Sequence, residues 1–237
     1  MEINCIPRIN FPNLKTAMLK NLTTLYGRVR IYLMNTMWIF LDKGILMSSS
    51  FLLTIYLARY LGPEKYGIFA YAISITSLFG IAGHFGLAGL LVKKFVKEPE
   101  KKLEILGTGF IIKGIGYFIG LILVIAFGFI TEPKYTEKFW LLMIIPFSLA
   151  FKPFDVIDFW FQSKLNYKYT ALSRVFAILI TLSASLVLIY SGASLVALSI
   201  AHLSQSFLIA LFFIYFMLVK SKICPRDFKF SKSKARE

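Results

Sequence analysis

The amino-acid sequence predicts an all-α, polytopic membrane protein built as a bundle of six transmembrane helices. Its 237 residues are 57% hydrophobic with a mean hydropathy of +0.70, more apolar surface than a soluble domain of this length could bury. Six apolar stretches each reach the roughly 20 residues that a helix needs to cross a hydrocarbon core. Lys and Arg residues gather between alternate stretches, as expected for a chain that crosses a membrane repeatedly.

Short connections join the six expected spans, which are residues 38–60, 66–92, 103–130, 139–161, 170–190 and 193–219. Gly62 and Pro63 end the first span and begin the second, which predicts a tight hairpin. In the third span, Gly116 and Gly120 form a small-xxx-small pair that favours close helix packing over a dedicated hinge.

Pro146 and Pro153 are expected to bend the fourth span.

The distribution of basic residues predicts the orientation in the membrane. Twenty of the 27 Lys and Arg residues fall in segments 1–37, 93–102, 162–174 and 220–237, which would share one side of the membrane. Because basic loops are retained in the cytoplasm, we expect both termini on the cytoplasmic side of the inner membrane. The other side would carry only Arg59, Lys65, Lys134 and Lys138.

We divide the chain into a basic N-terminal segment (1–37), the bundle (38–219) and a basic cytoplasmic tail (220–237). An amphipathic pattern within the N-terminal segment indicates a helix on the inner leaflet, with a frayed tail as the alternative. The net charge of +15 is better explained by membrane topology and by attraction to anionic lipid head groups than by binding of nucleic acid. Cys5 and Cys224 fall in the expected cytoplasmic tails, which implies no disulfide and no metal.

Ionisable residues inside the spans are the candidate substrate-binding residues, because each costs about 3 kcal/mol at mid-bilayer unless it faces protein or water. In the fourth span, Lys152, Asp155, Asp158 and Gln162 are spaced by three, three and four residues. This spacing places them on one helix face. The stripe either lines a cavity or contains a Lys152–Asp155 pair that neutralises itself.

The other spans hold further charged candidates. Lys113 is the best single candidate for a buried cation, because it lies about ten residues into its span. Asp42 and Lys43 are interpreted as an interfacial ion pair. Arg59 and Arg174 lie at span ends, where head-group anchoring is favoured over a cavity role.

His84 and His202 are interpreted as packing residues rather than proton carriers. No Ser/His/Asp set, Cys/His cluster or paired solvent-facing carboxylates is evident, which argues against an enzyme.

Three segments carry a family resemblance. They are ARYLGPEKYG at 58–67 within the longer stretch 35–80, GLAGLLVKKF at 86–95, and KPFDVIDFWFQSKLNYKYTALSR at 152–174. Together they resemble the oligosaccharide flippases of polysaccharide biosynthesis, in the multidrug, oligosaccharidyl-lipid and polysaccharide exporter superfamily.

The resemblance implies a two-lobed exporter fold with a central cavity, of which this six-helix bundle corresponds to the N-terminal lobe. Such proteins move a polyprenyl-diphosphate-linked glycan across the cytoplasmic membrane by alternating access, with cationic residues holding the diphosphate. No cofactor is implied. The candidate cavity residues are Lys113, Lys152, Asp155, Asp158, Gln162, Lys43, Arg59 and Arg174. Asp155 or Asp158 could also couple transport to an ion gradient.

The family has about twelve or fourteen spans, whereas this chain has six. We therefore expect it to be one lobe, or to pair with a second six-helix lobe supplied by itself or by another chain. The alternatives are a multidrug-type exporter, a membrane-embedded glycosyltransferase or polymerase, and an inactive remnant. Deep lysines favour an anionic substrate, and the longest expected outer loop, 131–138, is short for a glycosyltransferase.

Overall fold

The structure is a computed structural model that describes residues 11–83, 86–133 and 136–221. These residues form helices and no strand. By length and composition, five helices could cross a membrane: Val29–Gly80, Pro99–Thr131, Glu137–Ser163, Tyr167–Tyr190 and Leu195–Lys220. The prediction of an all-α polytopic membrane protein is confirmed.

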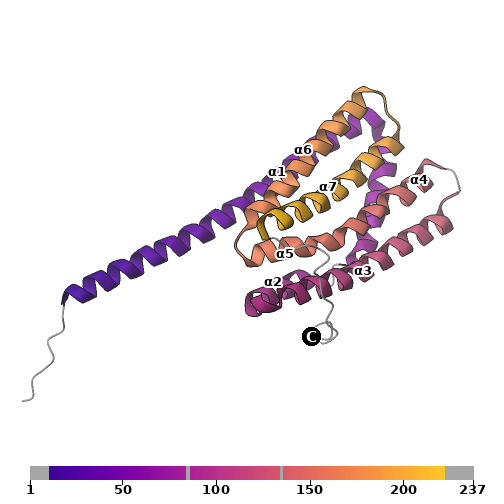
Figure 1. The fold of residues 1–237 in the computed structure, drawn as a ribbon. Coiled ribbons are helices and arrows are strands. Elements are labelled where there is room, and N and C mark those ends of the chain that lie inside the picture. The colour runs from indigo at the N-terminus through magenta and orange to yellow at the C-terminus, as the bar shows by residue number, and fades with distance from the viewer. Residues whose placement is uncertain (1–10, 84–85, 134–135, 222–237) are drawn as a thin grey trace, which may run out of the picture.

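The first of these helices contains the first expected span and the beginning of the second. Helix α1 (Phe11–Gly80) has a non-helical residue at Gly62, with φ 73° and ψ 169°, followed by Pro63 inside the helix. Glycine adopts positive φ without a steric penalty, and proline lacks the N–H that would continue the helix. Leu46 and Ile73, on opposite sides of Gly62, line the same cavity. The two arms of α1 therefore fold back as a hairpin (Figure 1), and both arms line this cavity.

The prediction of one continuous helix over residues 66–92 is wrong. The second arm of α1 ends at Gly80, a 3₁₀ turn η1 (Ile81–Gly83) follows, and α2 (Leu87–Lys97) begins after Gly86. The break lets η1 approach α3 (Lys102–Thr131), because a Cβ on Gly83 would lie 2.4 Å from the Tyr117 ring. Apolar residues continue through the break, so the length of the apolar stretch does not reveal the interruption.

The fourth span is interrupted where its prolines predict a bend. It consists of α4 (Glu137–Ile144), a 3₁₀ segment η3 (Ile145–Phe154) and α5 (Asp155–Ser163). Pro146 and Pro153 both lie in η3. A 3₁₀ run of this length is uncommon and is typical of a strained or functional position in a helix. Two continuous helices complete the bundle: α6 (Tyr167–Tyr190) and α7 (Leu195–Ser221).

The connections lie at two opposite ends of the bundle (Figure 1). The bend of α1, the α3–α4 connection and the α6–α7 turn share one end, and the hydroxyl of Tyr60 donates to the carbonyl of Ala193 there. The α5–α6 turn and the short η2 helix (Pro99–Lys101) between α2 and α3 share the other. This alternation matches the expected topology, and the cytoplasmic placement of the second end stays a prediction.

Large apolar side chains also cover the outside of the bundle. On α3, Ile115, Phe118 and Ile122 are 58%, 62% and 50% exposed. A helix with an apolar outer face is suited to contact with lipid.

The backbone of residues 11–37 continues α1 as a helix that extends away from the bundle (Figure 1). Its position on a lipid surface stays a prediction. Cys5, His84, Cys224 and residues 222–237 of the basic tail lie outside the described residues.

A glycine substitution in α3 tests the packing of this helix on α1. A Cβ on Gly120 would lie 2.7 Å from the backbone oxygen of Phe79, so we expect Gly120→Ala to destabilise the bundle by about 1–3 kcal/mol. Gly114→Ala is the matched control, because its Cβ would meet only Pro153 Cγ at 4.0 Å. Melting temperatures in detergent, followed by circular dichroism, should fall for the first variant alone. Equal melting temperatures would contradict this packing.

Candidate functional site

Two contiguous cavities lie between the arms of α1 and the helices that face them. We call the one nearer Gly62 the bend chamber and the other the charged chamber. The bend chamber, of about 460 Å³, is lined by residues of α1, α6 and α7. The charged chamber, of about 490 Å³, also receives residues from α3, η3 and α5. Both are lined by Leu46, Ile73, His202 and Gln205, so the two chambers are adjacent and share part of their wall.

The charged chamber brings together side chains that are far apart in the sequence. Lys43 comes from α1, Lys152 from η3, Asp155 from the start of α5 and Arg174 from α6. Neither the Lys152 side chain nor the Asp155 side chain forms a hydrogen bond or ion pair with another described residue. The alternative of a self-neutralising Lys152–Asp155 pair is therefore not what the structure contains. These charges are available to a ligand in the chamber.

Arg174 joins two buried carboxylates beside the charged chamber. Its Nη1 donates to Asp42 Oδ2 at 2.9 Å, and its Nη2 donates to Asp158 Oδ2 at 2.6 Å. The Tyr167 hydroxyl donates to Asp42 Oδ2 at 2.6 Å, and Gln162 Nε2 donates to Asp158 Oδ1 at 3.0 Å. We call these five residues the Arg174 network. It connects α1, α5 and α6.

The network corrects two interpretations of the sequence. Asp42 is 1% exposed and pairs with Arg174, rather than forming an interfacial pair with Lys43. Arg174 is largely buried and bridges two carboxylates, rather than anchoring to lipid heads. The physical reason is that a buried carboxylate needs a cationic partner, and the planar guanidinium can serve two at once.

Lys113 is buried, as its depth in the span predicts. Its side chain is 1% exposed, and its Nζ lies 4.5 Å from the centroid of the Phe159 ring and 5.8 Å from that of Tyr117. Nζ has no hydrogen-bond partner among the described residues. Cation–π contacts of this kind stabilise a desolvated ammonium. Lys113 lines neither chamber, although its neighbour Tyr117 lines the charged one.

The structure therefore brings some of the eight predicted site residues together and leaves others apart. Asp158 and Gln162 are held in the Arg174 network, and Arg59 is exposed on α1 and lines neither chamber. Residues that line the charged chamber are Lys43, Lys152, Asp155 and Arg174.

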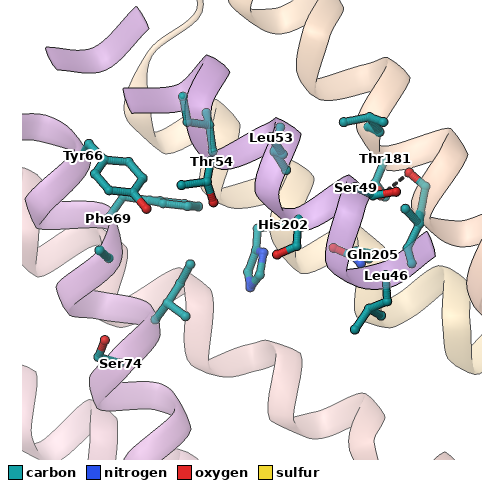
Figure 2. Close-up of a pocket in the computed structure, with 16 residues that line it drawn as sticks. Leu46, Ser49, Leu53, Thr54, Tyr66, Phe69, Ser74, Thr181, His202 and Gln205 are labelled. Carbon is teal, nitrogen blue, oxygen red and sulfur yellow. Dashed lines mark hydrogen bonds between the residues drawn. The ribbon is translucent and has the colours of Figure 1, made fainter. Parts of the chain in front are cut away.

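Two lining residues of α7 were not chosen from the sequence. His202, interpreted as a packing residue, and Gln205 both line the two chambers, and their side chains point into the space beside α1 (Figure 2). The His202 ring packs edge-on against Phe69, with centroids 5.9 Å apart. The available signal was their spacing of three residues within an apolar span, which places both on one helix face.

The fold and the cavities define a polytopic membrane protein with polar chambers between apolar helices. A family model described as polysaccharide biosynthesis protein matches residues 32–237. The chain belongs to this family, as its motifs predict, and members of the family are in general transporters rather than enzymes. No curated protein and no solved structure matches the chain.

Removal of the guanidinium tests the Arg174 network. Arg174→Met would leave Asp42 and Asp158 buried without their cation, so we expect a loss of about 3–5 kcal/mol in the free energy of unfolding. Adding Asp158→Asn should recover part of that loss, because it removes one uncompensated charge. Unfolding in detergent titrated with sodium dodecyl sulfate gives the measurement.

Arg59→Met serves as the control, because Arg59 is exposed and has no ion pair among the described residues. It should unfold like the parent chain. Equal losses for the two arginine variants, or no recovery with Asp158→Asn, would contradict the bridging role.

Proposed function

We propose that this protein moves a polyprenyl-diphosphate-linked oligosaccharide across the cytoplasmic membrane for polysaccharide biosynthesis. The observation that carries the proposal is the pair Lys43 and Lys152, two cations without ionic partners that line a cavity inside an apolar bundle. Membership of the polysaccharide biosynthesis protein family supports the same substrate class.

The charges favour an anionic ligand. Arg174 is already bonded to two carboxylates, so Lys43 and Lys152 are the cations left to bind a diphosphate. Ammonium groups replace the water around phosphate oxygens as point charges. Asp155 lines the same chamber and would disfavour a second anion close to it. In this proposal the polyprenyl tail stays in the bilayer, where it requires no polar partner.

Transport would follow alternating access. Near the bend, Leu57, Phe69, Leu195 and Leu198 pack in one apolar cluster, which is suited to close the path at that end. The interruptions at Gly62, η1 and η3 are the positions at which helix segments could rotate. A second six-helix lobe, from another copy or another chain, would complete the enclosure of the two chambers.

Lysine substitutions test this function. In a strain that lacks its polysaccharide flippase, we expect the parent chain, with a second lobe supplied if required, to restore surface glycan and lower the lipid-linked precursor. Lys152→Gln and Lys43→Gln should each weaken diphosphate binding about tenfold or more, the worth of one charged hydrogen bond, and leave the precursor accumulated.

Lys138→Gln is the control, because Lys138 is exposed at the bend end of the bundle, outside both chambers. It should restore glycan like the parent. If both chamber variants restored glycan fully at equal membrane levels, the proposed role of the chamber lysines would be wrong.

A further inference from the structure

The bend chamber differs from the charged chamber in its chemistry. None of its sixteen lining residues is Asp, Glu, Lys or Arg. The charged chamber, which shares part of its wall, contains four such residues. Charge is therefore confined to the charged chamber, and the chamber nearer the bend is neutral.

The bend chamber is nevertheless rich in free hydrogen-bonding groups. Thr181 is satisfied by backbone carbonyls of its own helix. The other polar lining side chains form no hydrogen bond with described residues: Ser49, Ser50, Thr54, Tyr66, Ser74, His202 and Gln205. None of these seven side chains is fully buried, so water or a ligand in the chamber can complete their hydrogen bonds.

These groups match the chemistry of an uncharged sugar. Each sugar hydroxyl donates and accepts hydrogen bonds, as do the amide of Gln205, the imidazole of His202 and the serine and threonine hydroxyls. Tyr66 and Phe69 offer aromatic surface to the C–H faces of a sugar ring (Figure 2). The volume of about 460 Å³ falls in the usual range for small-molecule sites.

The position of the chamber fits the covalent order of the substrate. In a lipid-linked oligosaccharide the first sugar is bonded directly to the diphosphate. Since His202 and Gln205 line both chambers, a diphosphate at Lys152 would place that sugar beside them. A sugar carboxylate there would lose its hydration and find no lining cation, which disfavours acidic sugars.

We propose that the bend chamber is a saccharide subsite for uncharged sugars, with Gln205 and His202 as its specificity-determining residues. This inference rests on the proposed function, because it assumes that the diphosphate occupies the neighbouring charged chamber.

Binding measurements on the purified full-length chain, in lipid nanodiscs and by native mass spectrometry, test the subsite. The probes are undecaprenyl diphosphate alone, the same carrier linked to glucose, and the same carrier linked to glucuronic acid. Glucose and glucuronic acid differ only in the oxidation of one carbon. We expect the glucose-linked carrier to bind about tenfold more tightly than the other two, a gain equivalent to one or two net hydrogen bonds.

Gln205→Leu should abolish the preference for the glucose-linked carrier over the bare carrier. Thr54→Val, which removes one hydroxyl at nearly constant volume, should reduce the preference and provides a second variant if Gln205→Leu fails to fold. Ser204→Ala is the control: Ser204 lies on the same helix as Gln205, lines neither chamber and should keep the preference.

The outcomes separate the subsite from the proposed function. Lys152→Gln should weaken all three carriers by a similar factor. If the bare carrier binds through Lys152 but glucose adds nothing, or glucuronic acid binds best, the subsite is overturned and the diphosphate proposal stands. If no carrier binds the parent chain, both are overturned.

Discussion

The bridge from Arg174 to Asp42 and Asp158 is the interaction on which the rest of this bundle depends. It joins α1, α5 and α6 with charged hydrogen bonds of 2.9 and 2.6 Å. Because the guanidinium donates to both carboxylates, it gives these buried acids a cationic partner that lipid could not supply. The bridge also determines which charges remain available. Lys43 follows Asp42 on α1 and lines the charged chamber, where Lys152 also lies without an ionic partner.

Interrupted helices provide the space beside this bridge. The chain departs from regular α-helix at Gly62, at η1 and along η3. Irregular backbone at membrane depth is tolerated where it is buried in protein or lines a cavity. Segment η3 lines the charged chamber through Ile145, Ser148, Leu149 and Lys152. The irregular segment η3 therefore forms part of the cavity wall, while the apolar outer faces of the helices are left to contact lipid.

Composition and local signals predict the fold class, the reversal at Gly62 and Pro63, the irregular fourth span and the family. They depend on residues close in sequence or on the length of apolar segments. The Arg174 network was not predicted, because Asp42 and Arg174 are 132 residues apart and each has a plausible local interpretation. The break at η1 was missed because apolar residues continue through it. The position of His202 depends on how α7 packs against both arms of α1, which periodicity does not reveal.

The central claim is that a hydrated path runs inside the bundle while the outer face meets lipid. The test begins with a variant in which Ser replaces Cys5 and Cys224. Gln205→Cys then places a single thiol at the chambers, and Phe118→Cys places one on the exposed face of α3. Reaction with a small hydrophilic thiosulfonate in intact membranes requires water and a thiolate. We expect the thiol at 205 to react and the thiol at 118 to remain unmodified. An unreactive thiol at 205, or equal rates at both positions, would contradict the hydrated path.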